Sequence, residues 1–435
     1  MEAFNGTAVV NMTVKKLEPV LVHPAAETFK GLYFLSNIDQ TFPSPIEIMF
    51  SYEGNGMGNE NAADVMKESL AKNLVKFYPL AGSLTLGLDG KMHVQCTGEG
   101  VLFVEATSDC TLEELGDISY IDSKFRELIH YVDGVDSILN VPLLTVQMTR
   151  FRCGGIVLGI AMNHILMDGE ALLYFLKSWG KITRGIHLSV EPYLNRSILS
   201  PRQPPILDIP HPEFVKLETK TSTPSDQESR IYQSFCFKPQ KLQQLKQLAK
   251  EKGSVTNPTS FEVISALMWI MRTKAFKTEP HVTIKLLTAV DVRTKIKPPM
   301  PDCYFGNCYA VSCAVCKAGD LIEKPFSFAV KIVQEALKKV TDDYIKSTID
   351  YYEVTRDVLQ AENTAWISKW SRLPFYEIDF GWGEPVQVAP ASMVWNLAVT
   401  ISQRRESGNI ILTLGFPESV MERFREMMLL ELEQK

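Results

Sequence analysis

The 435-residue sequence has no excess of basic residues: 45 Lys and Arg stand against 51 Asp and Glu, which gives a formal net charge of −6. Because a protein that binds nucleic acid needs a positive face for the phosphates, this balance argues against nucleic acid as a partner. The chain also lacks any apolar run near the roughly 18 residues of a membrane-crossing helix, and its first residues lack the basic start and apolar stretch of a signal peptide. We therefore expect a cytosolic protein without a transmembrane segment.

Cysteine is also scarce. Eight cysteines in a chain of this length are too few for a disulfide scaffold, which fits free thiols in a reducing compartment. Cys303, Cys308, Cys313 and Cys316 cluster, but the paired short spacings of a zinc site are missing, and the alternation over 309–315 predicts a strand. We therefore expect no metal site. The sequence also has no Gly-x-Ser-x-Gly motif, so it offers no activated serine for covalent catalysis.

The length and composition fit a globular protein of two domains. A chain of 435 residues exceeds one ordinary core and suits two domains of about 200 residues each. Six prolines lie among serines and threonines over residues 200–229, which predicts a long extended crossing. We expect an N-terminal domain over 1–200, a crossover linker over 201–229 and a C-terminal domain over 230–435.

Hydrophobic spacing predicts the main helices and strands. Helices are expected over 62–77, 239–251, 260–274, 325–346 and 418–433. Antiparallel strands are expected over 84–106, and further strands over 142–151, 282–292, 309–315, 393–402 and 409–416. Thr259 and Glu262 have the spacing of a capping box at the start of the third helix. Gly54, Gly56 and Gly58 partly match a dinucleotide-binding loop. The third glycine of that motif would fall at Asn59, however, and no Asp or Glu stands about 20 residues beyond Gly58, which favours a flexible connection.

The stretch 155–181 predicts a buried strand, a polar turn and an amphipathic helix. Residues 155–162 form a continuous apolar run, typical of a strand buried on both faces. Asp168 stands just before the helix in the position of an N-cap. His164 lies in the turn, and imidazole has an ordinary pKa of about 6.5, which lets it take and return a proton near neutral pH. His164 is therefore a candidate general base, although a structural histidine and a simple capping aspartate fit the same two residues.

A second motif favours the catalytic interpretation. The pair formed by His-x-x-x-Asp-Gly at residues 164–169 and Asp-Phe-Gly-Trp-Gly at residues 379–383, in this order and separation, resembles the plant BAHD acyltransferases. Four other segments are placed as in that family: Phe-Tyr-Pro-Leu-Ala-Gly at 77–82, Thr-Ser-Phe-Glu-Val at 259–263, Asp-Val-Arg at 291–293 and Tyr-Phe-Gly-Asn at 304–307. Ser83 departs from the family pattern, which usually has arginine there. The resemblance covers nearly the full chain.

This resemblance implies an α/β fold of two chloramphenicol-acetyltransferase-like domains with mixed β-sheets and an active site in an interdomain channel. Acyl-CoA would enter as a co-substrate from one side and the acceptor from the other, with no bound cofactor. His164 would take the proton from an acceptor hydroxyl, whose oxygen attacks the acyl thioester directly without an acyl-enzyme. Holding both substrates together supplies much of the acceleration.

The resemblance also implies residues that shape the site without touching substrate. Asp168, followed by Gly169, would turn away from the substrate and pair with Arg293. The second motif would be a structural loop away from the reacting atoms, with its key positions at Asp379, Gly381, Trp382 and Gly383.

Further candidates come from segments that resemble substrate-contacting stretches of the family. Trp370 is the candidate oxyanion donor through its indole N–H, with Ser368 beside the acceptor. A buried core tryptophan is the alternative. For the CoA tail we consider Lys252, Ser254 and Ser260, where a helix start would meet phosphate. A solvated loop explains these three residues equally well.

Within the family, segments 18–22, 30–37 and 96–106 are similar to plant hydroxycinnamoyl transferases that act on ω-hydroxy fatty acids and fatty alcohols. This similarity implies a feruloyl or caffeoyl donor and products of the cutin, suberin or wax phenolic type, with Ser36 as a candidate substrate contact. Two alternatives stay open: a family member with another alcohol or an amine as acceptor, and a non-catalytic relative that binds acyl-CoA or a partner protein. In the main interpretation the partners are small molecules and the protein is a monomer.

Overall fold

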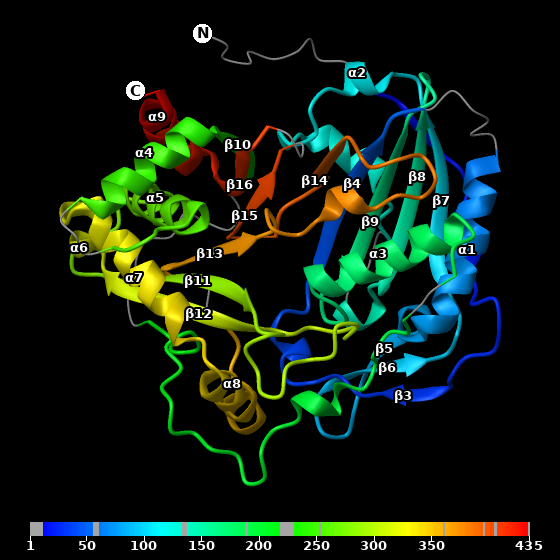
Figure 1. The fold of residues 1–435 in the computed structure, drawn as a ribbon, viewed down its shortest axis with the longest axis horizontal. Coiled ribbons are helices and arrows are strands. Elements are labelled where there is room, and N and C mark those ends of the chain that lie inside the picture. Colours follow the sequence, from blue (N-terminus) through cyan, green and yellow to red (C-terminus); the bar gives the residue numbers. More distant parts are fainter. Residues whose placement is uncertain are drawn as a thin grey trace. The chain divides into compact units, whose positions relative to one another are not determined.

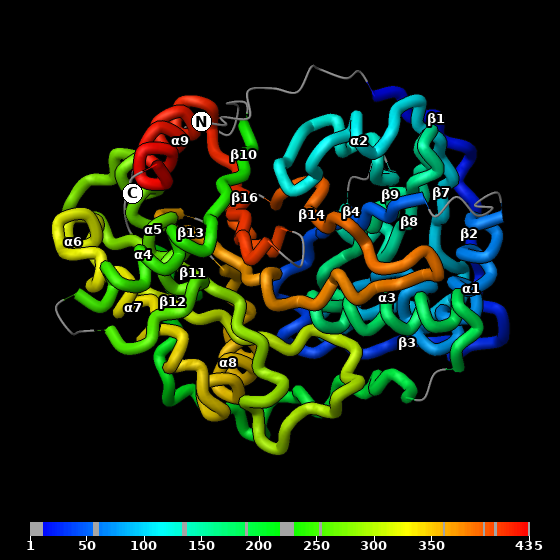
Figure 2. The backbone as a smooth tube through the Cα atoms, turned by 45° about the horizontal axis from the view of Figure 1, so that its top comes forward, coloured from blue at the N-terminus to red at the C-terminus, as the bar shows by residue number. Residues whose placement is uncertain are grey.

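The computed structural model describes residues 12–54, 61–132, 137–187, 190–217, 230–251, 255–359, 362–394, 396–403 and 407–433. The chain divides into two compact units. Unit 1 comprises residues 1–198, 301–307 and 373–392, and unit 2 comprises residues 199–300, 308–372 and 393–435. The tube in Figure 2 lets the reader follow each segment by its colour.

Unit 1 contains a mixed sheet of seven strands. Its order is β1-β7-β8-β9-β4-β14, and β2 also pairs with β7. The strands are β1 (Val14–Lys16), β2 (Val20–Val22), β4 (Pro45–Tyr52), β7 (Val101–Ser108), β8 (Leu144–Phe151), β9 (Ile156–Asn163) and β14 (Gln387–Pro390). All pairs are antiparallel except β7 with β8. Helices α1 (Ala62–Lys76) and α3 (Gly169–Thr183) pack on each other beside this sheet (Figure 1).

A smaller antiparallel sheet completes unit 1, with β3 (Gly31–Tyr33), β6 (Met92–Cys96) and β5 (Ser83–Leu86) in that order. The antiparallel arrangement expected over 84–106 is therefore confirmed for β5 and β6. β7 belongs instead to the large sheet, where it lies antiparallel to β1 and β2 and parallel to β8. The reason is burial: Val101, Phe103 and Val104 are each at most 1% exposed, so this strand belongs in the main core.

Unit 2 contains a mixed sheet of six strands in the order β10-β16-β15-β13-β11-β12. The strands are β10 (Arg230–Phe237), β11 (Thr283–Asp291), β12 (Tyr309–Lys317), β13 (Thr364–Lys369), β15 (Leu397–Ser402) and β16 (Ile410–Pro417). The helices are α4 (Pro239–Lys250), α5 (Ser260–Ala275), α6 (Ala318–Glu323), α7 (Phe326–Lys339), α8 (Asp342–Thr355) and α9 (Glu418–Glu433). One core joins side chains of the sheet to α4, α5, α7 and α9.

Shorter helical segments connect these elements. They are η1 (Asp39–Thr41), η3 (Tyr78–Ala81), α2 (Leu112–Leu115), η4 (Ser123–Leu128), η5 (Ile138–Asn140), η6 (Arg196–Leu199) and η7 (Phe375–Glu377). None of the described helices combines the length and the apolar character that crossing a membrane would require. Among the described residues, no group of three or more His, Cys, Asp or Glu side chains is arranged to hold a metal ion.

The expected helices over 62–77, 239–251, 260–274 and 418–433 are confirmed as α1, α4, α5 and α9. The single helix expected over 325–346 is wrong, because α7 ends at Lys339 and α8 starts at Asp342. Thr341 accepts a hydrogen bond from the N–H of Tyr344 through its side chain and so starts a new helix. The amphipathic spacing continues across this break, which is why the sequence did not reveal it.

The structure differs from the expected domain ranges. The first segment of unit 1 ends close to residue 200, but residues 301–307 and 373–392 also belong to unit 1 instead of to a C-terminal domain over 230–435. The physical reason is strand pairing, since β14 pairs with the edge of β4, with Gln387 opposite Ser51 (Figure 2). The motif at residues 379–383 therefore lies in unit 1.

The expected crossover is described over residues 201–217, which contain no helix or strand, while 218–229 lie outside the described residues. This segment is tied to α8 of unit 2. The Asp350 carboxylate accepts hydrogen bonds from Arg202 N at 2.7 Å, Arg202 Nε at 2.6 Å and Ile206 N at 2.9 Å. The part of the crossover at residues 201–217 thus belongs to unit 2.

Candidate active site

A tight turn, the elbow (residues 163–168), joins β9 to α3 and carries His164. The N–H of Leu166 donates to the main-chain oxygen of Asn163 at 3.1 Å, which closes the turn. The N–H of His164 donates to Ser44 O at 2.9 Å, just before β4. The apolar strand ends at Asn163, a residue type that favours turns because its side chain bonds to nearby backbone. The elbow is therefore anchored to the sheet at its start.

Asp168 caps the helix that follows. Its Oδ1 accepts a hydrogen bond from Ala171 N at 3.0 Å, which confirms the predicted N-cap. A carboxylate at this end also interacts favourably with the helix dipole. A Cβ atom on Gly169 would lie 2.6 Å from Leu373 Cδ1, so the helix start packs closely against residues 373–392. The elbow is thus anchored at its end as well.

The His164 ring is partly buried in unit 1. The ring of Phe42 packs edge-on against it, with centroids 5.3 Å apart and an interplanar angle of 85°. Burial lowers the pKa of His164 below its ordinary value, and the carboxylates of Asp168 and Asp39 oppose this shift without reversing it. A histidine with a lowered pKa is neutral at pH 7, which is the form that can accept a proton.

Asn307 binds the main chain of the elbow. Its Nδ2 donates to His164 O at 2.7 Å and to Ile165 O at 3.1 Å. The same amide nitrogen donates to Asp39 Oδ1 at 2.9 Å. Asn307 is fully buried and belongs to segment 301–307, the second of the segments that make up unit 1.

Arg196 binds the next elbow carbonyl. Its Nη2 donates to Leu166 O, its Nε donates to Tyr33 Oη at 3.0 Å, and its Nη1 lies 2.5 Å from Asp39 Oδ1. Both charged side chains of this ion pair are fully buried. Burial acts to lower the pKa of Arg196, but the Asp39 carboxylate outweighs it and holds that pKa above its ordinary value. The guanidinium is therefore permanently charged.

Ser36, a candidate substrate contact, also belongs to this group. Its main-chain N–H and its hydroxyl each donate to Asp39 Oδ2 at 2.7 Å, and the residue is fully buried. Sequence reasoning missed Asp39 and Arg196 altogether. The only signal in the sequence is indirect: segment 304–307 resembles a family segment, but the resemblance assigns it no role.

The loop at residues 379–383 has a tightly bonded backbone. Asp379 Oδ1 accepts from Gly381 N at 2.7 Å and from Gly383 N at 3.0 Å, and Asp379 Oδ2 pairs with Arg184 Nη1 at 3.0 Å. Both glycines have positive φ, +102° and +90°, a conformation that residues with a Cβ rarely adopt. The glycines of this motif therefore serve its backbone shape.

This loop packs on the C-terminal half of α3. Phe380 meets Trp179 with ring centroids 5.0 Å apart, and Trp382 meets Tyr52 at 5.5 Å. A Cβ on Gly180 would lie 2.4 Å from Asp379 O, so the helix and loop touch through their backbones. Because a helix rises about 1.5 Å per residue, the loop lies roughly 15–20 Å along α3 from the elbow.

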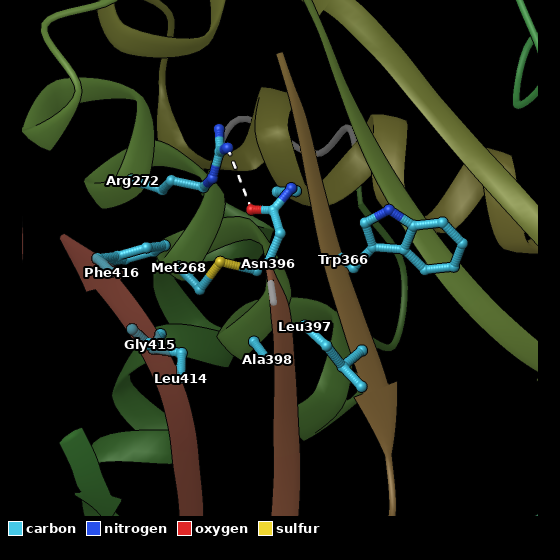
Figure 3. Close-up of a pocket in the computed structure, with 10 residues that line it drawn as sticks. Met268, Arg272, Trp366, Asn396, Leu397, Ala398, Leu414, Gly415 and Phe416 are labelled. Atoms are coloured by element: carbon cyan, nitrogen blue, oxygen red, sulfur yellow. Dashed lines mark hydrogen bonds between the residues drawn. The ribbon is translucent and has the colours of Figure 1, made fainter. Parts of the chain in front are cut away.

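Two candidate site residues of unit 2, Ser368 and Trp370, lie in strand β13 and directly after it. Ala365 and Ile367 point into the helix-covered core, so Trp366 and Ser368 lie on the opposite face of the sheet. Figure 3 shows Trp366 directed away from the side chains around α5. Trp370 follows in the same alternation, is held by its N–H to Thr400 O at 2.9 Å, and keeps partial exposure.

Of the three candidates for the CoA tail, only Ser260 is described, because Lys252 and Ser254 lie outside the described residues. Ser260 is the first residue of α5, and the predicted capping box is confirmed: Thr259 Oγ1 accepts from Glu262 N at 3.2 Å, and Glu262 Oε2 accepts from Thr259 N at 2.9 Å. A basic residue that the sequence did not single out lies nearby. Lys369 Nζ is 5.2 Å from the Phe261 ring, and burial lowers its pKa to about 8.

Arg293 lies in unit 2, at the start of the loop that follows β11. Its Nη1 is 2.7 Å from Asp291 Oδ1, and its main-chain oxygen accepts from Met300 N at 2.9 Å. The ion pair between Asp168 and Arg293 stays a prediction.

Two cavities in the described part of the chain contain none of the candidate residues. One, near α5, has a volume of about 10 Å³, enough for a single water, and is lined by Arg272, whose Nη2 lies 3.3 Å from Asn396 Oδ1 (Figure 3). The other, of about 450 Å³, lies over residues 24–30 and Gly98 of unit 1. The chemistry expected of His164 is therefore not tied to either cavity.

Comparisons with a family model and with known sequences both match the chain to transferases. A model described as the transferase family matches residues 12–430. The chain is 43% identical to omega-hydroxypalmitate O-feruloyl transferase of Arabidopsis thaliana, over 97% of this chain and 93% of the relative. It is 40% identical to fatty alcohol:caffeoyl-CoA acyltransferase of the same plant, over 96% of this chain and 98% of the relative.

Comparison with solved structures supports the fold. The chain is similar to vinorine synthase, with a TM-score of 0.77, 23% identity, and coverage of 96% of this chain and 98% of that one. It is also similar to F. graminearum TRI101 complexed with coenzyme A and deoxynivalenol, with a TM-score of 0.74, 15% identity, and coverage of 92% and 97%. The expected fold of two α/β units with mixed sheets is confirmed.

Proposed function

Since the chain belongs to the BAHD family of acyltransferases, we propose that it moves a hydroxycinnamoyl group, feruloyl or caffeoyl, from CoA to the hydroxyl of an ω-hydroxy fatty acid or a fatty alcohol. The observation that carries this proposal is that two relatives named for these donors and acceptors match the chain over nearly its full length. The products would be phenolic esters of the cutin, suberin or wax type.

His164 is the general base of the proposed reaction. Its neutral imidazole takes the proton from the acceptor hydroxyl as the oxygen forms a bond to the thioester carbonyl carbon. When the tetrahedral intermediate collapses, the C–S bond breaks and the imidazolium gives its proton to the CoA thiolate. The lowered pKa of His164 supports this role, because it keeps the ring neutral before substrate binds.

The developing oxyanion needs a hydrogen-bond donor, and Trp370 is the proposed one through its indole N–H. Its partial exposure supports this assignment, since a tryptophan committed to the core would have its N–H buried. Ser368 lies on the same sheet face and is the proposed neighbour of the acceptor. Both assignments come from the family resemblance.

The CoA tail is proposed to bind near the start of α5, through Lys252, Ser254 and Ser260. A helix N-terminus favours phosphate because its first N–H groups are unpaired and its dipole is positive there. The ammonium group of Lys369 adds basic character to the same region. CoA is here a co-substrate, and the protein needs no resident cofactor in this proposal.

The other motif residues are proposed to hold the fold rather than to touch substrate. Asp168 caps α3 and is proposed to pair with Arg293. The loop with Asp379, Gly381, Trp382 and Gly383 supports the far end of α3. We further propose that the protein acts as a cytosolic monomer on small-molecule substrates.

The test is a thiol-release assay with feruloyl-CoA and ω-hydroxypalmitate, comparing the wild type with His164→Ala and identifying the ester by mass spectrometry. Ester from the wild type and none from the variant supports both the substrate class and the base. Equal ester formation by both proteins would remove His164 from the mechanism.

The same assay separates the alternatives when the acceptor is varied. If neither protein uses the lipid acceptor, fatty alcohols, phenolic alcohols and amines are supplied in turn with the same donor. Turnover with one of these acceptors would support the acyltransferase activity and show that the acceptor differs from the proposed one. Binding of feruloyl-CoA without turnover across the whole panel would indicate a non-catalytic relative.

A further inference from the structure

Three consecutive main-chain carbonyls of the elbow, those of His164, Ile165 and Leu166, receive their hydrogen bonds from distant side chains. Buried carbonyl groups need donors, and these three lie after β9 and before α3, outside both regular elements. Asn307 Nδ2 donates to the first two, at 2.7 and 3.1 Å, and Arg196 Nη2 donates to the third. The path of the elbow is thus fixed from outside the elbow.

The two donors are in turn oriented by one carboxylate. Asp39 Oδ1 accepts from Asn307 Nδ2 at 2.9 Å and from Asn307 N at 3.2 Å, and it pairs with Arg196 Nη1. Asp39 Oδ2 accepts the N–H and the hydroxyl of Ser36. Both oxygens of this buried carboxylate are therefore occupied, and its position determines where Asn307 and Arg196 point.

A purely stabilising role would not require this arrangement. Removing charges from water is costly, and a buried ion pair stabilises a fold poorly compared with apolar side chains of the same size. A charged pair with several hydrogen bonds does, however, allow only one geometry. Its location beside the proposed base suggests what that geometry is for.

We propose that Asp39, Arg196 and Asn307 are positioning residues that hold the elbow carbonyls and thereby aim the His164 ring at its substrate. This inference rests on the proposed role of His164 as the base. None of the three residues is proposed to touch substrate.

The positioning residues act on the His164 ring through the main chain of His164. Its N–H is held by Ser44 O, and its carbonyl is held by Asn307, so the peptide groups on both sides of the residue are fixed. The side chain then keeps only its two χ torsions, and the edge-on contact with Phe42 restricts these. Loss of the Asn307 bonds frees the carbonyl side, and a small rotation there moves the ring nitrogens.

The main test variant is Asn307→Leu, which keeps the volume and removes the donors. We expect kcat to fall about 10- to 100-fold, the size of effect that a misplacement of about 1 Å produces, with KM changed by less than about threefold. The matched control is Asp350→Asn, which weakens another buried carboxylate–arginine contact, the one with Arg202, in unit 2. This control should lose stability in thermal unfolding while kcat stays near that of the wild type.

A milder variant, Ser36→Ala, keeps the test valid if Asn307→Leu does not fold. It removes one of the bonds to Asp39, and we expect a kcat loss of a few fold with KM unchanged. If Ser36 instead contacts substrate, KM rises and kcat holds. That result, or unchanged kcat in a folded Asn307→Leu protein, would overturn the proposal.

A substrate-free measurement separates this inference from the proposed function. In protein with labelled histidines, the imidazole signal lost in His164→Gln identifies His164, and its chemical shift and titration can be followed in each variant. We expect both to change in Asn307→Leu and to match the wild type in Asp350→Asn. An unchanged His164 signal in folded Asn307→Leu contradicts the inference even if no acyl transfer is found, and a changed signal supports it independently of the substrate.

Discussion

The amide nitrogen of Asn307 lies 2.7 Å from the main-chain oxygen of His164, although 143 residues separate them in the sequence. Asn307 reaches the elbow because residues 301–307 leave unit 2 and return to unit 1. The main chain of the candidate base is therefore held by a segment that lies far from it in the sequence.

The acid limb of the pH–rate profile should lie below the ordinary histidine value of about 6.5. Burial lowers the pKa of His164, so the neutral, active form persists to lower pH, and kcat/KM falls only when the pH drops through this lowered pKa. In Asp168→Asn the acid limb should lie at a still lower pH, because the lost carboxylate raises the pKa of His164 in the wild type. A profile of kcat/KM between about pH 4.5 and 9 tests both points, and a limb above 6.5 would contradict the environment described for His164.

Trp370→Phe should lower kcat by about 10²- to 10³-fold with little change in KM. Phenylalanine keeps the aromatic ring and removes the indole N–H, and loss of one oxyanion donor has an effect of this size. Steady-state kinetics with the preferred donor and acceptor measure it.

Trp366→Phe is the control for that variant, since Trp366 lies on the same face of the sheet four residues earlier. Its kcat should stay near that of the wild type. Equal losses in the two variants would assign both tryptophans to packing.

Asp379→Ala should destabilise the protein by about 2 kcal/mol, since it removes a charged group from several hydrogen bonds. The lost partners are Gly381 N, Gly383 N and the guanidinium of Arg184. Because the loop lies far along α3 from His164, the folded variant should keep its KM values. Chemical denaturation and kinetics measured on the same sample distinguish this outcome from a direct role in substrate binding, which would raise KM.

Gly180→Ala should cost about 1–3 kcal/mol, because a Cβ has no room where the backbones of α3 and the loop meet and such overpacking is destabilising. The new atom would lie 2.4 Å from the main-chain oxygen of Asp379. Urea unfolding gives the difference in the free energy of unfolding.

Lys181→Ala, at the exposed next position of the same helix, serves as the control for Gly180→Ala. It should stay within about 0.5 kcal/mol of the wild type. Because alanine has the highest helix propensity, propensity favours Gly180→Ala, and a loss of stability in this variant must come from the contact with Asp379. Equal free energies of unfolding for Gly180→Ala and Lys181→Ala would therefore contradict the predicted steric cost.

Local patterns in the sequence predicted the local structure well. One example is the succession of β9, the cap at Asp168 and α3, and another is the capping box at Thr259. Each depends on residues within one or two helical turns of each other, so the sequence itself shows the spacing. The break at Thr341 was missed because the apolar spacing continues through it.

Long-range relationships were predicted only where a motif carried them. His164 and the loop at 379–383 were found through the family resemblance, but the loop was assigned to the wrong domain because pairing of β14 with β4 leaves no local mark. Asp39 and Asn307 interact across 268 residues, and a buried aspartate or arginine in isolation has no periodic pattern that would reveal its partner. Only three-dimensional structure joins these positions.

The composition of unit 1 from three chain segments also affects synthesis on the ribosome. The edge of β4 is covered by β14, whose residues 387–390 come late in a chain of 435. Until they emerge, the large sheet has an open edge with unpaired N–H and carbonyl groups, a surface that can pair with other chains. A nascent or truncated chain that ends near residue 200 is thus prone to aggregate, and the large sheet is complete only after residues 387–390 have been synthesised.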